Sequence, residues 1–249
     1  MNAIRILACT ITLASALMMQ ACSSVEYSAE PIEAWVVDAD TNEPLEDVVV
    51  VADWVLEGGI SVNNFTKVNR IGDLVIMEAV TDKNGRFSFP AWGPKRATEG
   101  MLDDKDPRLL FFKSGYEYVG VDNSQYSRPM KYSDMGKPSG TESKPQGPLR
   151  KSFWNGETVK MKKFAGSLVK YSEHLSILSS RLDSFIFSAE GKCDWRNIPL
   201  VLRALDKQDD LFQKNYISRS TFVASLRSNE KYFRENGCGS VSEFLNGRK

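Results

Sequence analysis

The chain contains 249 residues, of which 42% are hydrophobic and 26% are charged, and equal numbers of basic and acidic residues leave no formal net charge. This is the composition of an ordinary globular protein, and the length suits one large or two small domains. His174 is the only histidine, and the four cysteines include no pair with CxxC spacing. These facts argue against a zinc site, and we expect neither a metal ion nor a cofactor.

Charge is unevenly distributed along the chain. Residues 22–123 contain 9 Lys and Arg against 19 Asp and Glu, whereas residues 124–249 contain 22 against 13. An acidic half followed by a basic half indicates that the halves pack against each other, or that the basic half meets lipid or an acidic partner. Two solvated faces of opposite sign are the alternative.

The first residues have the pattern of a secretory signal. Arg5 supplies a positive start, and residues 6–18 form an apolar run broken only by Thr10, Thr12 and Ser15. The run is shorter than the ~20 apolar residues that a membrane-spanning helix needs. We expect no nucleic-acid partner, because the protein is exported and contains no recognisable nucleic-acid-binding motif.

Residues 19–24 read Met-Gln-Ala-Cys-Ser-Ser, with the small Ala21 before Cys22 and a polar stretch after it. This segment resembles the lipobox of bacterial lipoproteins. The resemblance implies a signal peptide of residues 1–21, cleavage before Cys22, acyl chains such as palmitate on that cysteine, and a tether of residues 22–29. Such chains would hold the protein on a membrane.

Ser23, directly after the cysteine, favours the outer membrane, on its periplasmic face or at the cell surface. The alternative is an ordinary signal peptide that is cut near Ala21 and leaves Cys22 as a thiol.

Two cysteines remain after Cys9 leaves with the signal and Cys22 is acylated. Cys193 and Cys238 are expected to form a disulfide, which persists in an oxidising cell envelope. Two unrelated buried thiols are the alternative.

Short runs of β-branched and aromatic residues, separated by turn-forming residues, fill the first half of the folded chain. Six strands are predicted, in three consecutive pairs: Ile32–Asp38 with 48–55, 74–81 with Arg86–Phe89, and 109–113 with 116–121. In the second pair, Asn84-Gly85 forms a turn that tolerates a positive φ. Short strands with turns and no intervening helices predict an antiparallel β-sandwich.

Several motifs recur in a recognisable order: Val36-Val37-Asp38, Thr41, Pro44-Leu45, Val48-Val49-Val50, Thr81-Asp82, Gly85-Arg86-Phe87 and Ser114-Gly115-Tyr116. This order resembles the carboxypeptidase regulatory-like domain, a transthyretin-like β-sandwich. We assign it residues 30–163, with 157–162 as the closing strand. In carboxypeptidases this module accompanies a zinc peptidase domain, whose metal site one histidine cannot build.

Two stretches are longer than simple hairpin connections. Residues 57–73 and 123–155 are predicted as loops, and loops of such length are often functional or disordered. The second is rich in Pro, Gly, Ser and Lys, so it is interpreted as a mobile segment that is either a contact surface or a solvated loop.

Apolar residues recur at helical spacing after residue 163. One stripe runs from Leu168 to Phe185, a second follows Trp195 with Pro199 in the first turn, and a third is capped by Ser218 or Ser220 and stops at Asn236-Gly237. The sequence therefore predicts an α+β fold in which residues 164–249 form a small three-helix region.

Few residues stand out as candidates for catalysis. His174 is the only side chain whose ordinary pKa lies near neutrality, but its neighbours point to other helix faces, so we interpret it as a surface histidine. Residues 103–106 (Asp-Asp-Lys-Asp) resemble a calcium-loop fragment without its glycine and distal glutamate, and are interpreted as a solvated loop. We therefore name no catalytic residue.

The function expected from the sequence is a membrane-anchored envelope lipoprotein that acts as a non-catalytic binding or structural module for a protein or glycan. One alternative is an envelope hydrolase with a pair of carboxylates. Another is a scaffold subunit whose helical region docks on an envelope protein.

Overall fold

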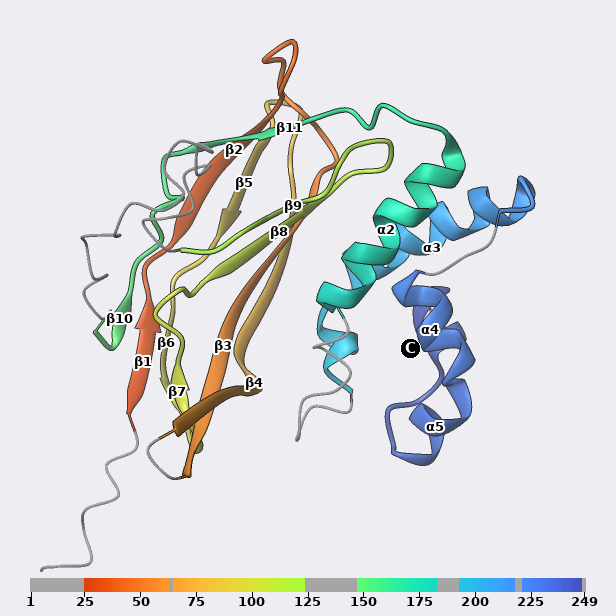
Figure 1. The fold of residues 1–249 in the computed structure, drawn as a ribbon. Coiled ribbons are helices and arrows are strands. Elements are labelled where there is room, and N and C mark those ends of the chain that lie inside the picture. The colour runs from red at the N-terminus through yellow and green to blue at the C-terminus, as the bar shows by residue number, and fades with distance from the viewer. Residues whose placement is uncertain (1–24, 63–64, 124–146, 183–192, 218–220, 248–249) are drawn as a thin grey trace, which may run out of the picture.

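The computed structural model describes residues 25–62, 65–123, 147–182, 193–217 and 221–247 (Figure 1). It is a mixed α+β fold in which two layers of sheet are followed by helices at the C-terminal end, as the sequence predicts. Most strand pairs are antiparallel. None of the helices within the described ranges has the length and apolar character needed to span a membrane.

The first layer is built around two successive strands, β1 and β2, each of which lies between two partners. Its members are β1 (Glu26–Ala29) between β10 (Leu149–Arg150) and β6 (Trp92–Arg96), and β2 (Ile32–Asp38) between β11 (Thr158–Met161) and β5 (Arg86–Phe89). β2 shows the alternation of a strand with one covered face, since Ile32, Ala34 and Val36 are buried and the residues between them are partly exposed.

The second layer has the order β4-β3-β8-β9, with the short β7 paired to β3 as well. Its strands are β3 (Val49–Val62), β4 (Phe65–Val80), β7 (Met101–Leu102), β8 (Arg108–Phe112) and β9 (Val119–Val121). The first half of β3, residues 49–55, is buried on both faces. Val50, Ala52 and Trp54 join the core between the two layers, whereas Val49 and Val51 face the other way and join the core of the helices. This explains why its sequence is a continuous apolar run and not an alternating one.

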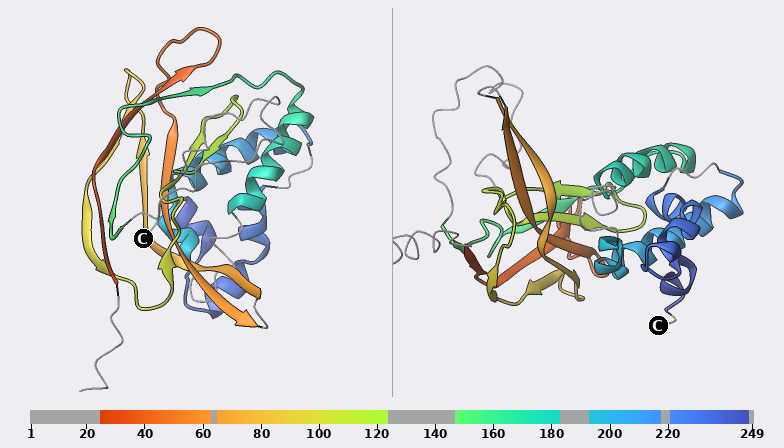
Figure 2. Two further views of the ribbon diagram at one scale, coloured as in Figure 1. Left: turned by 60° about the vertical axis from the view of Figure 1, so that its left-hand side comes forward. Right: turned by 90° about the horizontal axis from the view of Figure 1, so that it is seen from below.

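The helices cover the outer face of the second layer, as the two views of Figure 2 show. They are α2 (Leu168–Leu182), the 3-10 helix η4 (Asp194–Asn197), α3 (Pro199–Lys214), α4 (Phe222–Ser228), α5 (Glu230–Glu235) and α6 (Val241–Leu245). Their buried stripes pack against Val49, Val51 and Phe112 of the sheet. The acidic and basic halves of the chain therefore pack against each other.

A carboxylate from the sheet caps the longest helix. The Glu78 side chain, on β4, accepts hydrogen bonds from the backbone N–H of Leu200 (2.7 Å) and Val201 (2.9 Å) at the start of α3. The first N–H groups of a helix have no partner within it, so a carboxylate there satisfies two donors and interacts favourably with the helix dipole. Glu78 thereby ties the helices to the sheet.

The predicted turn at Asn84-Gly85 is confirmed. Gly85 has a φ of 71°, and its backbone N–H donates to the Asp82 carbonyl. A Cβ at this position would lie 2.3 Å from the Val36 carbonyl oxygen, so only glycine fits.

Strand partners differ from the sequence prediction. Only β8 and β9 form a hairpin among the three predicted pairs, because the turns after β2 and β4 carry the chain across to the other layer. The predicted closing strand exists as β11, but it runs parallel to β2. Residues 26–29 of the predicted tether form β1, and β6, β7 and β10 were not predicted either.

The two predicted loops also differ. Residues 57–62 and 65–73 belong to β3 and β4, which form one long antiparallel hairpin interrupted by register shifts next to Val55 and Glu57. Within 123–155, Asn123 is buried and residues 149–150 form β10, while 124–146 lie outside the described residues.

The helical region has more elements than the three predicted. The first two stripes form α2 and α3, with Pro199 in the first turn. The third is divided into α4 and α5, and α6 follows. The cap of α4 is Thr221, whose hydroxyl accepts from the Ala224 N–H, whereas the predicted caps Ser218 and Ser220 lie outside the described residues.

Glu78 generates a prediction about pH. Burial is the main cause that raises the pKa of Glu78 to about 7, so between pH ~4.5 and ~7 the folded state binds more protons there than the unfolded state. Stability must then fall as the pH rises through this window. Replacement of Glu78 by Gln (E78Q) removes that part of the fall, which is on the order of 1–3 kcal/mol.

Urea unfolding of both proteins at several pH values measures this effect. The two proteins should have similar free energies of unfolding near pH 4, where both side chains are uncharged. Toward pH 8 the wild type should become less stable than E78Q. If the free energies of unfolding of the two proteins change with pH in the same way, the raised pKa of Glu78 is contradicted.

Candidate functional site

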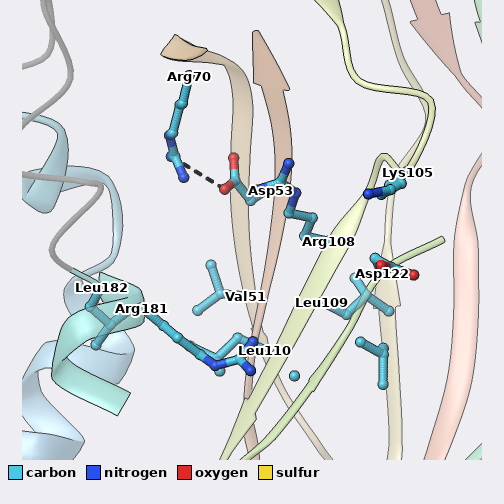
Figure 3. A pocket seen from close by; sticks show the side chains of 12 residues that line it. Val51, Asp53, Arg70, Lys105, Arg108, Leu109, Leu110, Asp122, Arg181 and Leu182 are labelled. Carbon is cyan, nitrogen blue, oxygen red and sulfur yellow. Dashed lines mark ion pairs between the residues drawn. The ribbon is translucent and has the colours of Figure 1, made fainter. Parts of the chain in front are cut away.

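An open cavity of about 710 Å³ lies between the second sheet layer and the end of α2 (Figure 3). Strands β3, β4, β8 and β9, the segment before β8 and the last turn of α2 all contribute to it. The lining residues are Val51, Asp53, Arg70, Lys105, Arg108, Leu109, Leu110, Gly120, Val121, Asp122, Arg181 and Leu182. An apolar surface next to a few charged groups is typical of a ligand site.

Asp53 lies at this cavity because of its place on β3. It continues the odd-numbered face of the strand after Val49 and Val51, which the helices cover. The carboxylate is ion-paired with Arg70 (Nη2 to Oδ2, 3.3 Å) on the neighbouring strand, and the dashed line in Figure 3 marks this pair. Arg70 is also ion-paired with Asp73, which is buried. One guanidinium therefore holds two carboxyl groups.

The surroundings of Asp53 disfavour its charged form. Burial raises its pKa well above the usual value, the nearby charge of Asp73 raises it further, and Arg70 acts in the opposite direction. Among the described residues, no hydrogen-bond partner reaches Asp53 Oδ1 or Asp73 Oδ2.

The second guanidinium of the site is partly exposed. Arg108 Nη2 lies 2.6 Å from Asp103 and 3.2 Å from Glu57. The arginine side chain is 40% exposed, against 28% for Glu57 and 11% for Asp103. Both acids are thus less exposed than the cation that they pair with.

The segment 103–106 is the expected solvated loop only in part, since Asp104 and Lys105 are exposed. Asp106 is fully buried and accepts a hydrogen bond from the Val55 N–H (3.0 Å), which fixes the segment to β3. Burial raises the pKa of Asp106 to about 8. Among the residues that the structure describes, no cluster of three or more His, Cys, Asp or Glu is arranged to hold a metal ion.

The site residues predicted from sequence lie elsewhere. Cys193 and Cys238 form a disulfide that ties the start of η4 to the segment between α5 and α6, and neither residue lines the cavity. The lipidation site Cys22 lies outside the described residues.

His174 is half-buried and is not the surface histidine expected. It packs beside Tyr118 and Phe164, and the Tyr118 N–H donates to its Nε2 (3.3 Å). Burial lowers the pKa of His174, while Glu117 raises it. The residue belongs to the contact between α2 and the sheet.

A second cavity of about 590 Å³ lies between the sheet and α3. Val49, Phe112 and Leu200 contribute apolar surface, and Arg203 and Lys207 contribute positive charge. It lies on the part of the helix that follows the Glu78 contact.

Comparison with known proteins gives no family. No family model and no curated protein matches the chain. Two solved structures resemble it weakly: 3-chlorocatechol 1,2-dioxygenase from Rhodococcus opacus 1CP (15% identity, TM-score 0.28, 57% of this chain and 62% of that one) and a 9R-lipoxygenase from Cyanothece PCC8801 (12%, 0.26, 85% and 28%). The chain spans less than two thirds of either protein, and likeness at this level carries no argument.

Sequence reasoning did not single out Asp53 and Arg70. One signal was present, since Asp53 interrupts an apolar run that is long enough to be a strand buried on both faces. A charge in such a strand needs a partner. Its partner Arg70 fell in the stretch that was interpreted as a loop.

Arg70 generates a prediction about stability. Replacement by Met (R70M) leaves two buried carboxyls without their guanidinium and should cost ~3–5 kcal/mol. Adding the change of Asp53 to Asn should recover part of the loss, because the amide removes one of the two acids. Urea unfolding at pH 7 checks both variants. If the double variant is less stable than R70M, the unpaired carboxyl of Asp53 is not a cause of the loss of stability in R70M.

Proposed function

We propose that the protein is a lipid-anchored envelope protein whose folded part is a non-catalytic binding module, with the cavity beside Asp53 as its ligand site. The fold proposed for residues 30–163 is a transthyretin-like β-sandwich of the carboxypeptidase regulatory-like type. Two facing layers of short strands, with the motif turn at Gly85 in place, support this proposal. Fold alone does not assign a function.

The cavity is the observation that carries the proposed function. It is large enough for a small ligand or for one unit of a polymer, and it combines apolar side chains with charged groups from several elements. A rigid frame supports it, since β3 and β8 are held by a core on either face. These are the properties of a preformed binding site.

The proposed anchor rests on the amino-terminal sequence. Arg5, the apolar run of residues 6–18 and the Ala21-Cys22-Ser23 sequence support export and acylation. The disulfide between Cys193 and Cys238 agrees with an oxidising compartment. We therefore propose the outer membrane, on its periplasmic face or at the cell surface, and a protein or glycan of the envelope as the partner.

A hydrolase is the second candidate, because Asp53 and Asp73 are two desolvated carboxyls that share one guanidinium partner, Arg70. Pairs of this kind can act as general acid and base. However, Asp53 lines the main cavity, whereas Asp73 lines a separate pocket of about 200 Å³ beside Gly72 and Thr98. Arg70 also binds both carboxyls, which favours a structural role.

Hydrogen-exchange mass spectrometry tests the binding function. The full-length mature protein, in nanodiscs, is compared with and without a small-molecule and oligosaccharide fraction of the bacterial envelope. Protection of residues 105–110 and 119–122 is expected, and it should be lost when Gly120 is replaced by Trp, because a side chain at this position meets Arg181 in the cavity. If the envelope fraction does not protect these residues in the wild type, the proposed binding function is refuted.

The same samples separate the two candidate functions. A binding module leaves the fraction chemically unchanged, and replacement of Asp53 by Asn (D53N) preserves the protection. Hydrolysis products that appear with the wild type and not with D53N would establish the enzyme instead.

The anchor has its own test. Replacement of Cys22 by Ser should abolish incorporation of labelled palmitate and move the protein from the membrane fraction to the soluble fraction, while Cys193→Ser should leave labelling unchanged. Intact-mass analysis of the purified wild type should give the mass of residues 22–249 plus acyl chains. Retention of residues 1–21 would refute the anchor.

A further inference from the structure

Three partly or fully exposed cations from different elements line the cavity beside Asp53. Lys105 precedes β8, Arg108 is its first residue, and Arg181 lies in the last turn of α2. Figure 3 shows Arg181 extending from the helix toward Leu110, on the side of the cavity opposite Arg70. Charges that are far apart in the sequence are thus brought to one opening.

Arg181 can lie across β9 because residue 120 is a glycine. A Cβ on Gly120 would lie 3.1 Å from Arg181 Nη1, which is closer than ordinary contact. The guanidinium also lies 5.9 Å from the centre of the Tyr118 ring, a distance at which a cation and an aromatic face attract. Arg181 is therefore positioned at the cavity.

The lining has an excess of positive charge. Four of its side chains are basic, and only Asp53 and Asp122 are acidic. Asp53 adds little negative charge to the accessible surface, because its side chain is only 8% exposed and is ion-paired with Arg70. The acids that pair with Arg70 and Arg108 are less exposed than Arg108, whose side chain is 40% exposed: Asp73 is 3%, Asp103 is 11% and Glu57 is 28% exposed. Since Lys105 and Arg181 are exposed as well, the accessible lining has more basic than acidic side chains.

The rest of the lining is apolar. Val51 and Leu182 form its floor and are at most 2% exposed, whereas Leu110 and Val121 on β8 and β9 are partly exposed. A ligand with a short hydrocarbon part would bury this remaining apolar surface, and a ligand that is charged throughout would not.

We propose that the cavity binds an organic anion, whose carboxylate or phosphate group is attracted by Lys105, Arg108 and Arg181 and whose short apolar part lies on Leu110 and Val121. Arginine is suited to this role, because its planar donors match the oxygens of both groups. The inference rests on the proposed binding function and adds the chemical class of the ligand.

A matched set of probes tests the charge preference: butyrate, butyl phosphate, butanol and butylamine share one chain and differ in the head group. The mature protein in nanodiscs, with labelled Val and Leu methyl groups, is titrated with each probe and the methyl resonances of Leu110 and Val121 are followed by NMR. Butyrate or butyl phosphate should bind at least about tenfold more tightly than butanol, since a hydrogen bond to a charged group contributes that much. Butylamine should bind most weakly, and the two anions together identify the preferred head group.

Variants assign the preference to the proposed residues. Arg181→Gln should weaken binding of the better anion about tenfold or more, and Gly120→Val, which displaces Arg181, should act in the same direction. Lys207→Gln is the matched control, because it removes an exposed cation from the second cavity. Binding of the anion should also weaken as salt is added.

The outcomes separate this inference from the proposed function. The ligand class is wrong if butanol binds as tightly as the anions. It is also wrong if Arg181→Gln and Lys207→Gln change the affinity for the better anion equally. In both cases the cavity still binds a ligand. If no probe binds while the envelope fraction protects the cavity, the inference fails alone. If neither the probes nor the fraction changes any signal at the cavity, both fail.

Discussion

Burial of the first half of β3 on both faces is the constraint on which the rest of the structure depends. One set of its side chains fills the core between the sheet layers, and the other set fills the core beneath the helices. A strand in this position has no solvated side, so any polar residue on it must be paired within the protein. Asp53 is such a polar residue, and Arg70 is its ion-pair partner. The cavity opens beside this pair.

The same constraint organises the charges. Arg70 approaches Asp53 from β4, and Arg108 is at the start of β8, so the strands on either side of β3 each supply a guanidinium. Their partner acids are more buried than Arg108 itself. The acidic character of the first half of the chain is thus partly internal, and the surface that the cavity presents has the opposite sign. Glu78 continues this pattern at the helix interface, where it meets the N–H groups of α3.

Local patterns predicted the segments with a clear period but neither the short strands nor the partners of the strands. The alternation in Ile32–Asp38 and the apolar spacing that gave α2 are properties of single segments, and both were confirmed. Which strands pair depends on whether a turn reverses the chain within a layer or carries it to the other layer, and the turns after β2 and β4 have no sequence feature that distinguishes the two. The β3–β4 hairpin was missed for a related reason, since its outer half is polar and glycine-containing.

The candidate site was harder to predict than the fold. Asp53, Arg70, Arg108 and Arg181 are far apart in the sequence and form no motif, so only the three-dimensional arrangement brings them together. The disulfide was predictable by contrast, because few cysteines remained to choose from and pairing needs no knowledge of the fold. His174 was misjudged because the sheet that covers its helix face is distant in sequence.

The position of β1 determines how far the folded part can lie from a membrane to which Cys22 is anchored. The strand begins at Glu26 and is fixed between β6 and β10, so only four residue steps separate it from Cys22. A chain of that length spans at most ~14 Å when fully extended. In the proposed acylated form the first sheet layer would therefore rest beside the lipid headgroups. Large partners would have to come to the bilayer surface, since the module could not extend toward them.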